Sequence, residues 1–101
     1  MSNISRHKGK NRTSNFELIW SEGTGNKKYK VKIFKNDKKI KTVQFGDKRY
    51  QQYQDNTPLK LYSFMDHNDK NRRRLYRLRH GGKGYQKILF SPAWFSWNFL
   101  W

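Results

Sequence analysis

The chain has 101 residues, enough for one small domain, and 23 Lys and Arg against seven Asp and Glu give it a formal net charge of +16. Self-repulsion of this size favours a partner that supplies negative charge: nucleic acid, an anionic membrane surface or an acidic protein. A disordered basic tail would be poor in aromatic residues, whereas 17% of this chain is aromatic, which predicts a folded basic domain. Cysteine is absent, which excludes disulfides and thiolate metal sites. No apolar stretch is long enough for a membrane span or a signal segment, so we expect an intracellular protein.

The N-terminal third predicts a basic arm followed by a first strand. Residues 1–14 are polar and basic, and we expect a flexible arm ahead of one small domain over residues 15–101. Phe16, Leu18 and Trp20 alternate with other residues, which predicts a short strand over 15–20.

The most regular pattern of the chain predicts a β-hairpin. Residues 28–34 alternate strictly between an apolar face (Tyr29, Val31, Ile33) and a lysine face (Lys28, Lys30, Lys32). A turn at 35–38 and a returning strand at 39–45 complete the hairpin. One apolar and one charged face indicate an antiparallel sheet with one side exposed.

The stretch from Asp66 to His80 is the most basic part of the chain. Asn68 or Asp69 can cap a helix over residues 70–80, and Gly81-Gly82 can end it. On this helix Leu75 and Leu78 share one narrow stripe, which we expect to dock on the core. The residues opposite that stripe would then point outward: Arg73, Tyr76, Arg77 and His80.

The remaining segments are shorter. Tyr50 and Tyr53 are three apart, as on a helical turn, and residues 59–65 are a short apolar piece, helical or extended. Residues 81–84 predict a flexible loop and residues 85–90 a further strand.

The C-terminus predicts an aromatic helix. Ser91 is a good N-cap and Pro92 suits the first helical position. Three tryptophans on one side, with two phenylalanines nearby, bring enough apolar area to close the core over the sheet. The alternative is that these aromatic residues face a partner protein. Together the elements predict an α+β fold: an antiparallel sheet of three or four strands built on the hairpin, covered by the C-terminal helix, with the basic helix on its flank.

The basic helix and the lysine face of the hairpin are the main candidate site. Dense positive charge binds the phosphate backbone without reading sequence. The candidate nucleic-acid-binding residues are Lys30, Lys32, Arg49, Arg72, Arg73, Tyr76, Arg77, Arg79, His80 and Lys83. Aromatic residues among these charges can stack on unpaired bases, and the candidates are Tyr50, Tyr53, Tyr62 and Tyr76; the alternative is that they lie at the edge of the core.

Two other kinds of site are weaker candidates. Three histidines and two aspartates (His7, His67, His80, Asp66, Asp69) raise the question of a metal-dependent nuclease with a ββα layout, but their spacing fits that layout poorly and the aspartates also suit helix capping. The Gly81–Gly84 loop could cradle phosphate by its backbone amides, yet it lacks the strand-loop-helix setting of a P-loop.

Several short motifs occur in a particular order: Phe45-Gly46-Asp47, Asp66-His67, Arg72-Arg73, Tyr76-Arg77, Arg79-His80, Ser91-Pro92-Ala93-Trp94 and Leu100-Trp101. In this order, over roughly residues 28–101, the chain resembles a family of small basic proteins of large nucleocytoplasmic DNA viruses, with related segments in tailed phages. The related phage segments carry a cysteine after the Arg-His pair, where this chain has Gly81, so the resemblance implies no zinc site here. The family has no established activity, and the resemblance implies a viral origin and a place in the particle or with the genome.

The expected function is therefore non-enzymatic, sequence-independent binding of nucleic acid, in the virion or during genome packaging, without a cofactor. The alternative is a minor capsid protein whose arginines meet acidic capsid surfaces. A small metal-dependent nuclease is the third hypothesis.

Overall fold

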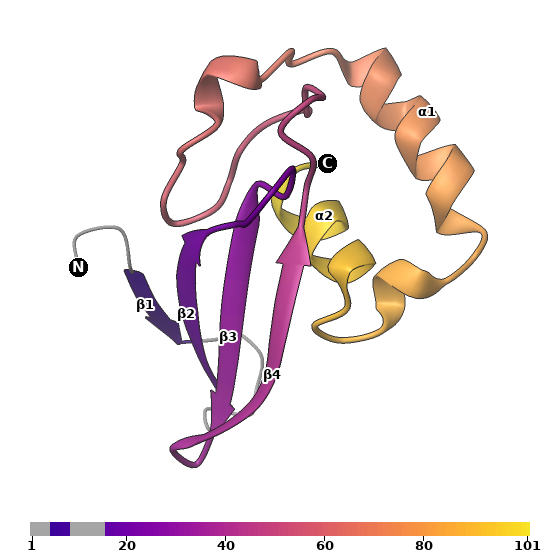
Figure 1. Cartoon of the computed structure of the whole chain (residues 1–101). Helices are drawn as coiled ribbons and strands as arrows, with labels where there is room; N and C mark the ends of the chain where they lie inside the picture. Colours follow the sequence, from indigo (N-terminus) through magenta and orange to yellow (C-terminus); the bar gives the residue numbers. More distant parts are fainter. Residues whose placement is uncertain (1–4, 9–15) are drawn as a thin grey trace.

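The computed structural model of the chain describes residues 5–8 and 16–101. Its sheet has four antiparallel strands in the order of the sequence (Figure 1): β1 (Ser5–Lys8), β2 (Phe16–Glu22), β3 (Tyr29–Lys35) and β4 (Lys38–Phe45). The sheet and the helices that follow it confirm the predicted α+β class. β1 pairs with β2, so residues 5–8, which we expected in a flexible arm, form a strand of the sheet. The other residues of the expected arm lie outside the described residues.

The hairpin of β3 and β4 forms as predicted. Lys35 pairs with Lys38, and the two residues between them, Asn36 and Asp37, both have positive φ angles (52° and 67°). Two left-handed residues in a two-residue loop match the right-handed twist of the strands, and Asn and Asp tolerate this conformation well.

The C-terminal helix α2 (Pro92–Phe99) closes the core over one face of the sheet, which confirms the expectation. The Ser91 hydroxyl caps it by accepting from the amide of Trp94 at 3.0 Å. The residue that enters the core is Phe95, whose ring stacks on Phe45 with centroids 5.2 Å apart. The tryptophans of α2 are only partly buried. The core is made by Leu18, Trp20, Tyr29, Val31, Ile33, Val43, Phe45, Tyr62, Phe90, Phe95 and Leu100.

The predicted strand over residues 85–90 is wrong. The segment instead holds the short 3₁₀ helix η2 (Tyr85–Lys87), between two left-handed residues, Gly84 (φ 75°) and Phe90 (φ 63°). Left-handed residues at both ends reverse the chain, so no extended run can form. Phe90 folds into the core beside Phe16, with ring centroids 5.1 Å apart.

The connection from β4 to the basic helix has little regular structure. It contains the 3₁₀ helix η1 (Ser63–Met65) and is otherwise held by buried side chains. The Asp55 carboxylate accepts from the Tyr29 hydroxyl, from the amide of Tyr62 at 3.0 Å, and from both the amide and the hydroxyl of Thr57 at 3.0 and 2.6 Å. Tyr50 and Tyr53 do not share a helical turn, because Lys28 donates to the Tyr50 carbonyl and the buried Gln52 side chain donates to Tyr62 and Asp66, which hold this segment in an irregular conformation.

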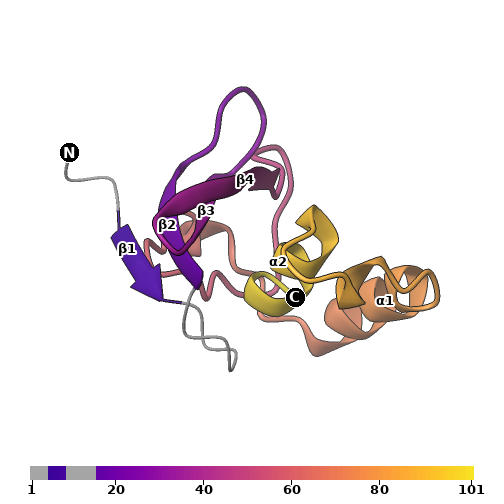
Figure 2. The same ribbon diagram turned by 90° about the horizontal axis from the view of Figure 1, so that it is seen from below.

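The basic helix α1 (Lys70–Gly81) has the bounds expected, with one more residue at its C-terminus. Asp69 is the N-cap, and its carboxylate accepts from the amides of Asn71 and Arg72 at 2.9 and 3.1 Å. Seen along the sheet, α2 lies between the strands and α1 (Figure 2). The basic helix therefore packs on the C-terminal segment.

Candidate functional site

The helix α1 docks by the face that we expected to point outward. Leu75 and Leu78 are 40% and 65% exposed, so the predicted docking stripe is wrong. Tyr76 takes its place: its ring stacks on Trp101 with centroids 4.3 Å apart and planes 4° from parallel. A stacked aromatic pair buries more apolar area than two leucine side chains, which explains why α1 docks by the face opposite to the predicted one.

Two arginines of α1 are also used for docking. The backbone oxygen of Trp101 accepts from Arg73 Nε at 2.7 Å and from an Arg77 terminal nitrogen at 3.1 Å. The Arg73 guanidinium lies over the ring of Tyr53 at 4.9 Å, and that of Arg77 over Trp97 at 4.7 Å. Burial, and then the nearby Arg73, lower the pKa of Arg77 from its ordinary value. Both side chains were predicted to contact nucleic acid, but the structure uses them to hold α1 in place.

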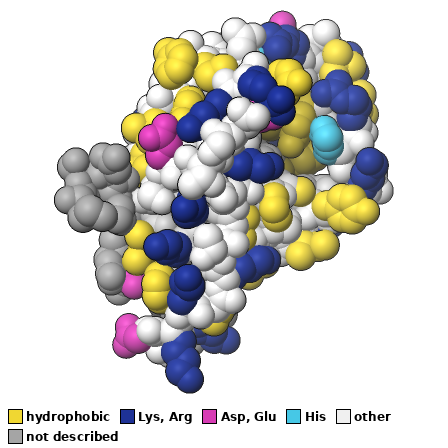
Figure 3. Space-filling model, viewed as in Figure 1, with side chains coloured by type: hydrophobic (Ala, Val, Ile, Leu, Met, Phe, Trp, Pro, Cys, Tyr) yellow, Lys and Arg dark blue, Asp and Glu magenta, His cyan; other side chains and the backbone are white. Residues whose placement is uncertain are grey.

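The other predicted residues of α1 line a cleft of about 570 Å³. The cleft lies between α1, α2 and the loop that leaves β4. Figure 3 shows a recess here with Lys and Arg side chains around it and hydrophobic atoms inside. Its basic lining consists of Lys27, Lys28, Arg72, Arg79 and His80, and its apolar lining includes Phe45, Tyr76, Ala93, Leu100 and Trp101.

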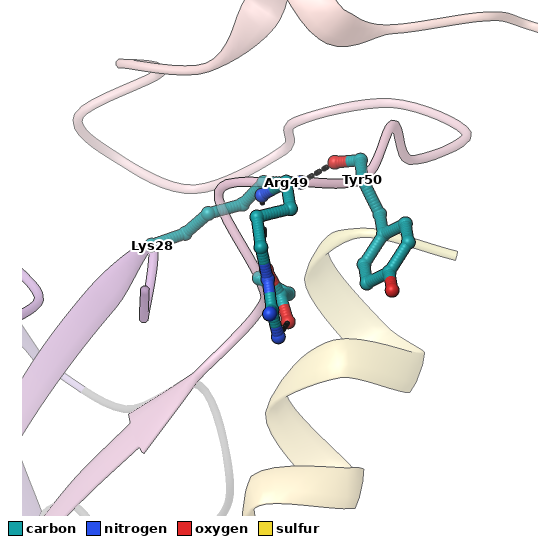
Figure 4. A network of polar contacts seen from close by, with 4 residues as sticks. Lys28, Arg49 and Tyr50 are labelled. Carbon is teal, nitrogen blue, oxygen red and sulfur yellow. Dashed lines mark hydrogen bonds and ion pairs between the residues drawn. The ribbon is translucent and has the colours of Figure 1, made fainter. Parts of the chain in front are cut away.

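Lys28, which was predicted on the exposed lysine face, is 1% exposed. It precedes β3 and extends toward the loop after β4, where its ammonium donates to the Tyr50 carbonyl at 2.7 Å (Figure 4). The same ammonium also donates to Gln52 Oε1. Burial lowers the pKa of Lys28. Gly46 makes room for it, because a Cβ there would lie 3.0 Å from Lys28 Cβ, and its φ of 76° also favours glycine. Lys28 therefore fixes the loop that forms one wall of the cleft.

That wall carries the one carboxylate among the described residues that line the cleft. The two oxygens of Asp47 accept from Arg49 Nε and a terminal nitrogen of Arg49 at 3.0 and 2.8 Å (Figure 4). These hydrogen bonds lower the pKa of Asp47 to about 2. Asp47 is therefore charged but already paired, and it offsets little of the positive potential of the cleft. Next to it Tyr50 is 65% exposed, with the Arg49 guanidinium 5.7 Å from its ring.

At the other side of the cleft, His80 is close to two cations of its own segment. Burial, followed by Arg79 and Lys83, lowers the pKa of His80. This shift favours the neutral imidazole, which can both donate and accept a hydrogen bond.

The lysines of the sheet do not join this cleft. Lys30 and Lys32 alternate with core residues and lie on the face of the sheet that points away from α2 and α1. The two parts of the main candidate site, the basic helix and the lysine face of the hairpin, therefore lie on two different sides of the molecule. Lys83 is exposed in the loop after α1.

Among the four tyrosines predicted to stack on bases, Tyr50 has the freest ring. Tyr62 is buried, and its hydroxyl donates to Glu22 at 2.9 Å, so the prediction is wrong for this residue. Tyr53 and Tyr76 are half-buried and already covered by rings or guanidinium groups.

The residues of the nuclease hypothesis make hydrogen bonds within the chain. His67 Nδ1 accepts from the amide of Asp69 at 2.9 Å, while the carboxylate of Asp69 caps α1. Asp66 Oδ1 accepts from the Gln52 side chain and the amide of Asp55 at 2.6 and 2.8 Å. Among the described residues no group of three His, Asp or Glu side chains is placed to hold a metal ion. The side chain of His7 lies outside the described residues.

The loop over 81–84 uses two of its amides internally. The amide of Lys83 donates to the His80 carbonyl at 3.4 Å and that of Gly84 to the Gly81 carbonyl at 3.2 Å. These groups make a turn and do not point together at a common ligand.

Lys27 and Ala93 line the cleft but were not predicted as site residues, and Lys28 was predicted only on the exposed lysine face of the hairpin. Nothing in the sequence marks them as cleft residues: Lys27 directly precedes the predicted strand, and Ala93 reads as helix interior. Their role becomes visible only when the loop after β4 is placed against α2.

Compared with protein-family models, curated proteins and solved structures, the chain shows no match. In the part of the chain that the structure describes, no helix has the length and apolar character needed to cross a membrane.

Proposed function

We propose that the protein binds nucleic acid without sequence preference and without catalysing a reaction. The observation that carries this proposal is the cleft, which is lined by Lys27 on one wall and by Arg72 and Arg79 of α1 on another, and whose one carboxylate among the described lining residues is already paired with an arginine. Positive charge concentrated around a recess attracts polyanions and strengthens their binding there. The net charge of +16 adds a long-range attraction of the same sign.

The absence of sequence preference follows from the kind of groups that are exposed. Arg72 and Arg79 are the arginines that α1 directs at the cleft, and such charges contact phosphates, which are the same for every sequence. The outer face of α1 presents Leu75 and Leu78 at its centre, which leaves it poorly equipped to read base edges in a major groove. A role with a viral genome or in a virus particle rests on the family resemblance and is part of the proposal.

The test is a salt titration of binding to labelled DNA, with two variants that each lose two charges. Arg72→Ala with Arg79→Ala removes cations from the cleft, and Lys30→Ala with Lys32→Ala removes cations from the open face of the sheet. We expect tight binding at low salt, and a log–log salt slope that falls by roughly 1.4–1.8 in the cleft variant, about 0.7–0.9 for each lost phosphate contact. The sheet variant should change less. Affinity that does not depend on salt, or no binding in dilute buffer, would refute the proposal.

A second candidate function, docking on an acidic protein such as a capsid subunit, is favoured by the exposed face of α1. Leu75 and Leu78 lie there between Arg74 and Arg79, an arrangement that suits an apolar surface edged with carboxylates. Co-sedimentation with purified capsid protein tests it. Leu75→Ser with Leu78→Ser should then abolish co-sedimentation and leave DNA affinity unchanged.

A further inference from the structure

We infer that the cleft holds an unpaired nucleotide, with its base inside and its flanking phosphates on the rim, so that the protein prefers single-stranded to duplex nucleic acid. This inference rests on the proposed function and adds the form of the ligand. It depends on three features of the cleft: its lining, the separation of its cations and its size.

The inside of the cleft is suited to a flat, weakly polar ring. Ala93 and the half-buried rings of Tyr76 and Trp101 supply apolar and aromatic surface, above Phe45 and Leu100, which are 1% and 2% exposed. Bases stack on such surfaces whatever their identity, because every base has a π-face. Tyr50 stands at the entrance with most of its ring exposed, and it can cover a base from the outer side.

The cations of the rim are spaced for more than one phosphate. Arg72 and Arg79 are seven residues apart on α1, which places their Cα atoms about 10.5 Å apart along the helix axis. Two guanidinium groups at that separation can contact different phosphates of a strand that passes over the cleft, and Arg72 would exchange its exposed hydrogen bond to Gln51 Oε1 (3.0 Å) for one of them. Lys27 lies on the opposite wall, so the phosphate backbone would run between α1 and the end of the sheet.

The size of the cleft distinguishes single-stranded from duplex nucleic acid as a ligand. Its volume of about 570 Å³ is within the range of roughly 300–1,000 Å³ that is usual for sites that take small ligands. A base in a duplex is stacked and paired, so it can enter only after the duplex opens, which costs a few kcal/mol. A duplex can therefore touch the rim cations, whereas a single strand can also use the inside of the cleft.

The decisive variant fills the cleft without changing its charge. Ala93 lines the cleft from the second position of α2, and Ala93→Phe should occupy the space meant for the base. Binding is measured by fluorescence anisotropy with a labelled oligothymidylate and with a duplex of the same length. In the wild type the single strand should bind at least tenfold more tightly than the duplex. In Ala93→Phe we expect the preference for the single strand to disappear while the affinity for the duplex is retained. Circular dichroism of the variant verifies that it is folded.

Tyr50→Ala is a second variant that keeps the test usable if Ala93→Phe does not fold. The Tyr50 side chain is exposed, and its carbonyl contact to Lys28 is a backbone contact that alanine preserves. This variant should weaken single-strand binding severalfold and leave duplex binding unchanged. Adenosine monophosphate should compete with the oligothymidylate more strongly than inorganic phosphate does.

The outcomes distinguish the inference from the function on which it rests. Equal affinity for single strand and duplex, both falling with salt, would overturn the inference and leave nucleic-acid binding in place. The same holds if Ala93→Phe, correctly folded, keeps the wild-type preference, or if inorganic phosphate competes as well as the nucleotide. Absence of binding to either DNA would overturn both.

Discussion

Replacing Arg73 and Arg77 by alanine should destabilise the protein, although both lie on a basic helix of a strongly basic protein. The two guanidinium groups share one acceptor, the backbone oxygen of Trp101, and each also covers an aromatic ring. A hydrogen bond from a charged donor contributes about 1.5–3 kcal/mol, and a cation–π contact at a partly exposed site about 0.5–1 kcal/mol.

Because both side chains are only partly buried, the lower ends of these ranges apply, which gives about 2 kcal/mol for each arginine. Removing both also relieves the repulsion between them, so the double variant should lose roughly 3 kcal/mol. Each single variant should lose less than half of this, because the remaining arginine still satisfies the Trp101 oxygen. For a domain of this size a loss of 3 kcal/mol corresponds to a Tm lower by roughly 15 °C.

Urea unfolding of the two single variants and the double variant measures these values and their coupling. The matched control is Arg72→Ala with Arg79→Ala, which removes the same charge from the cleft-facing side of the same helix and breaks one exposed hydrogen bond, from Arg72 to Gln51 Oε1 at 3.0 Å. The control should stay within about 0.5 kcal/mol of the wild type. If the double variant were as stable as the control, and lost as much DNA affinity, the two arginines would be binding residues and our account of α1 would be wrong.

Leu75→Ser with Leu78→Ser should leave the free energy of unfolding within about 0.5 kcal/mol of the wild type, because both leucines are exposed on α1; a loss of several kcal/mol in urea unfolding would restore them as a docking stripe. Asp55→Ala should cost about 3 kcal/mol or more in the same assay, because buried donors would lose their acceptor. Burial and a carboxylate hydrogen bond raise the pKa of Tyr62 from its ordinary value of 10.0 to about 12. Its contribution to stability is therefore complete below pH 10 and is lost as the pH rises toward 12. Tyr62→Phe should reduce this alkaline loss, leaving the part due to Tyr29, whose pKa burial also raises; an unchanged pH profile would contradict this.

The local patterns of the chain were enough to predict most elements. The alternation over residues 28–45 defines the hairpin, because only one face of a strand can be buried at a time. The capping residues Asp69 and Ser91 define the starts of α1 and α2, since their side chains satisfy amides that the helices leave free. In each case the necessary information lies within a few residues of the element.

The orientation of α1 could not be predicted in the same way. A stripe of two leucines is a reasonable docking face when the partner surface is an ordinary apolar core. The surface that α1 meets is instead the partly exposed aromatic side of the C-terminal segment, with a free backbone oxygen at Trp101. Such a surface favours Tyr76 and two arginines over leucine, and it exists only after the C-terminal segment has folded onto the sheet. Lys27 and Ala93 escaped prediction as cleft residues for the same reason.

The positive charges of the described structure differ in how far the chain itself stabilises them. Lys28, Arg49, Arg73 and Arg77 donate to oxygen acceptors of the chain and so contribute to its fold. The cations on the cleft rim and on the open face of the sheet have little negative charge near them, because the chain has only seven acidic residues. Their repulsion opposes folding in the free protein and weakens when salt screens it. The same screening weakens the attraction of a polyanion. If the proposed function is correct, stability of the free protein should therefore rise with salt while affinity for nucleic acid falls, because the same charges would oppose folding and attract the polyanion.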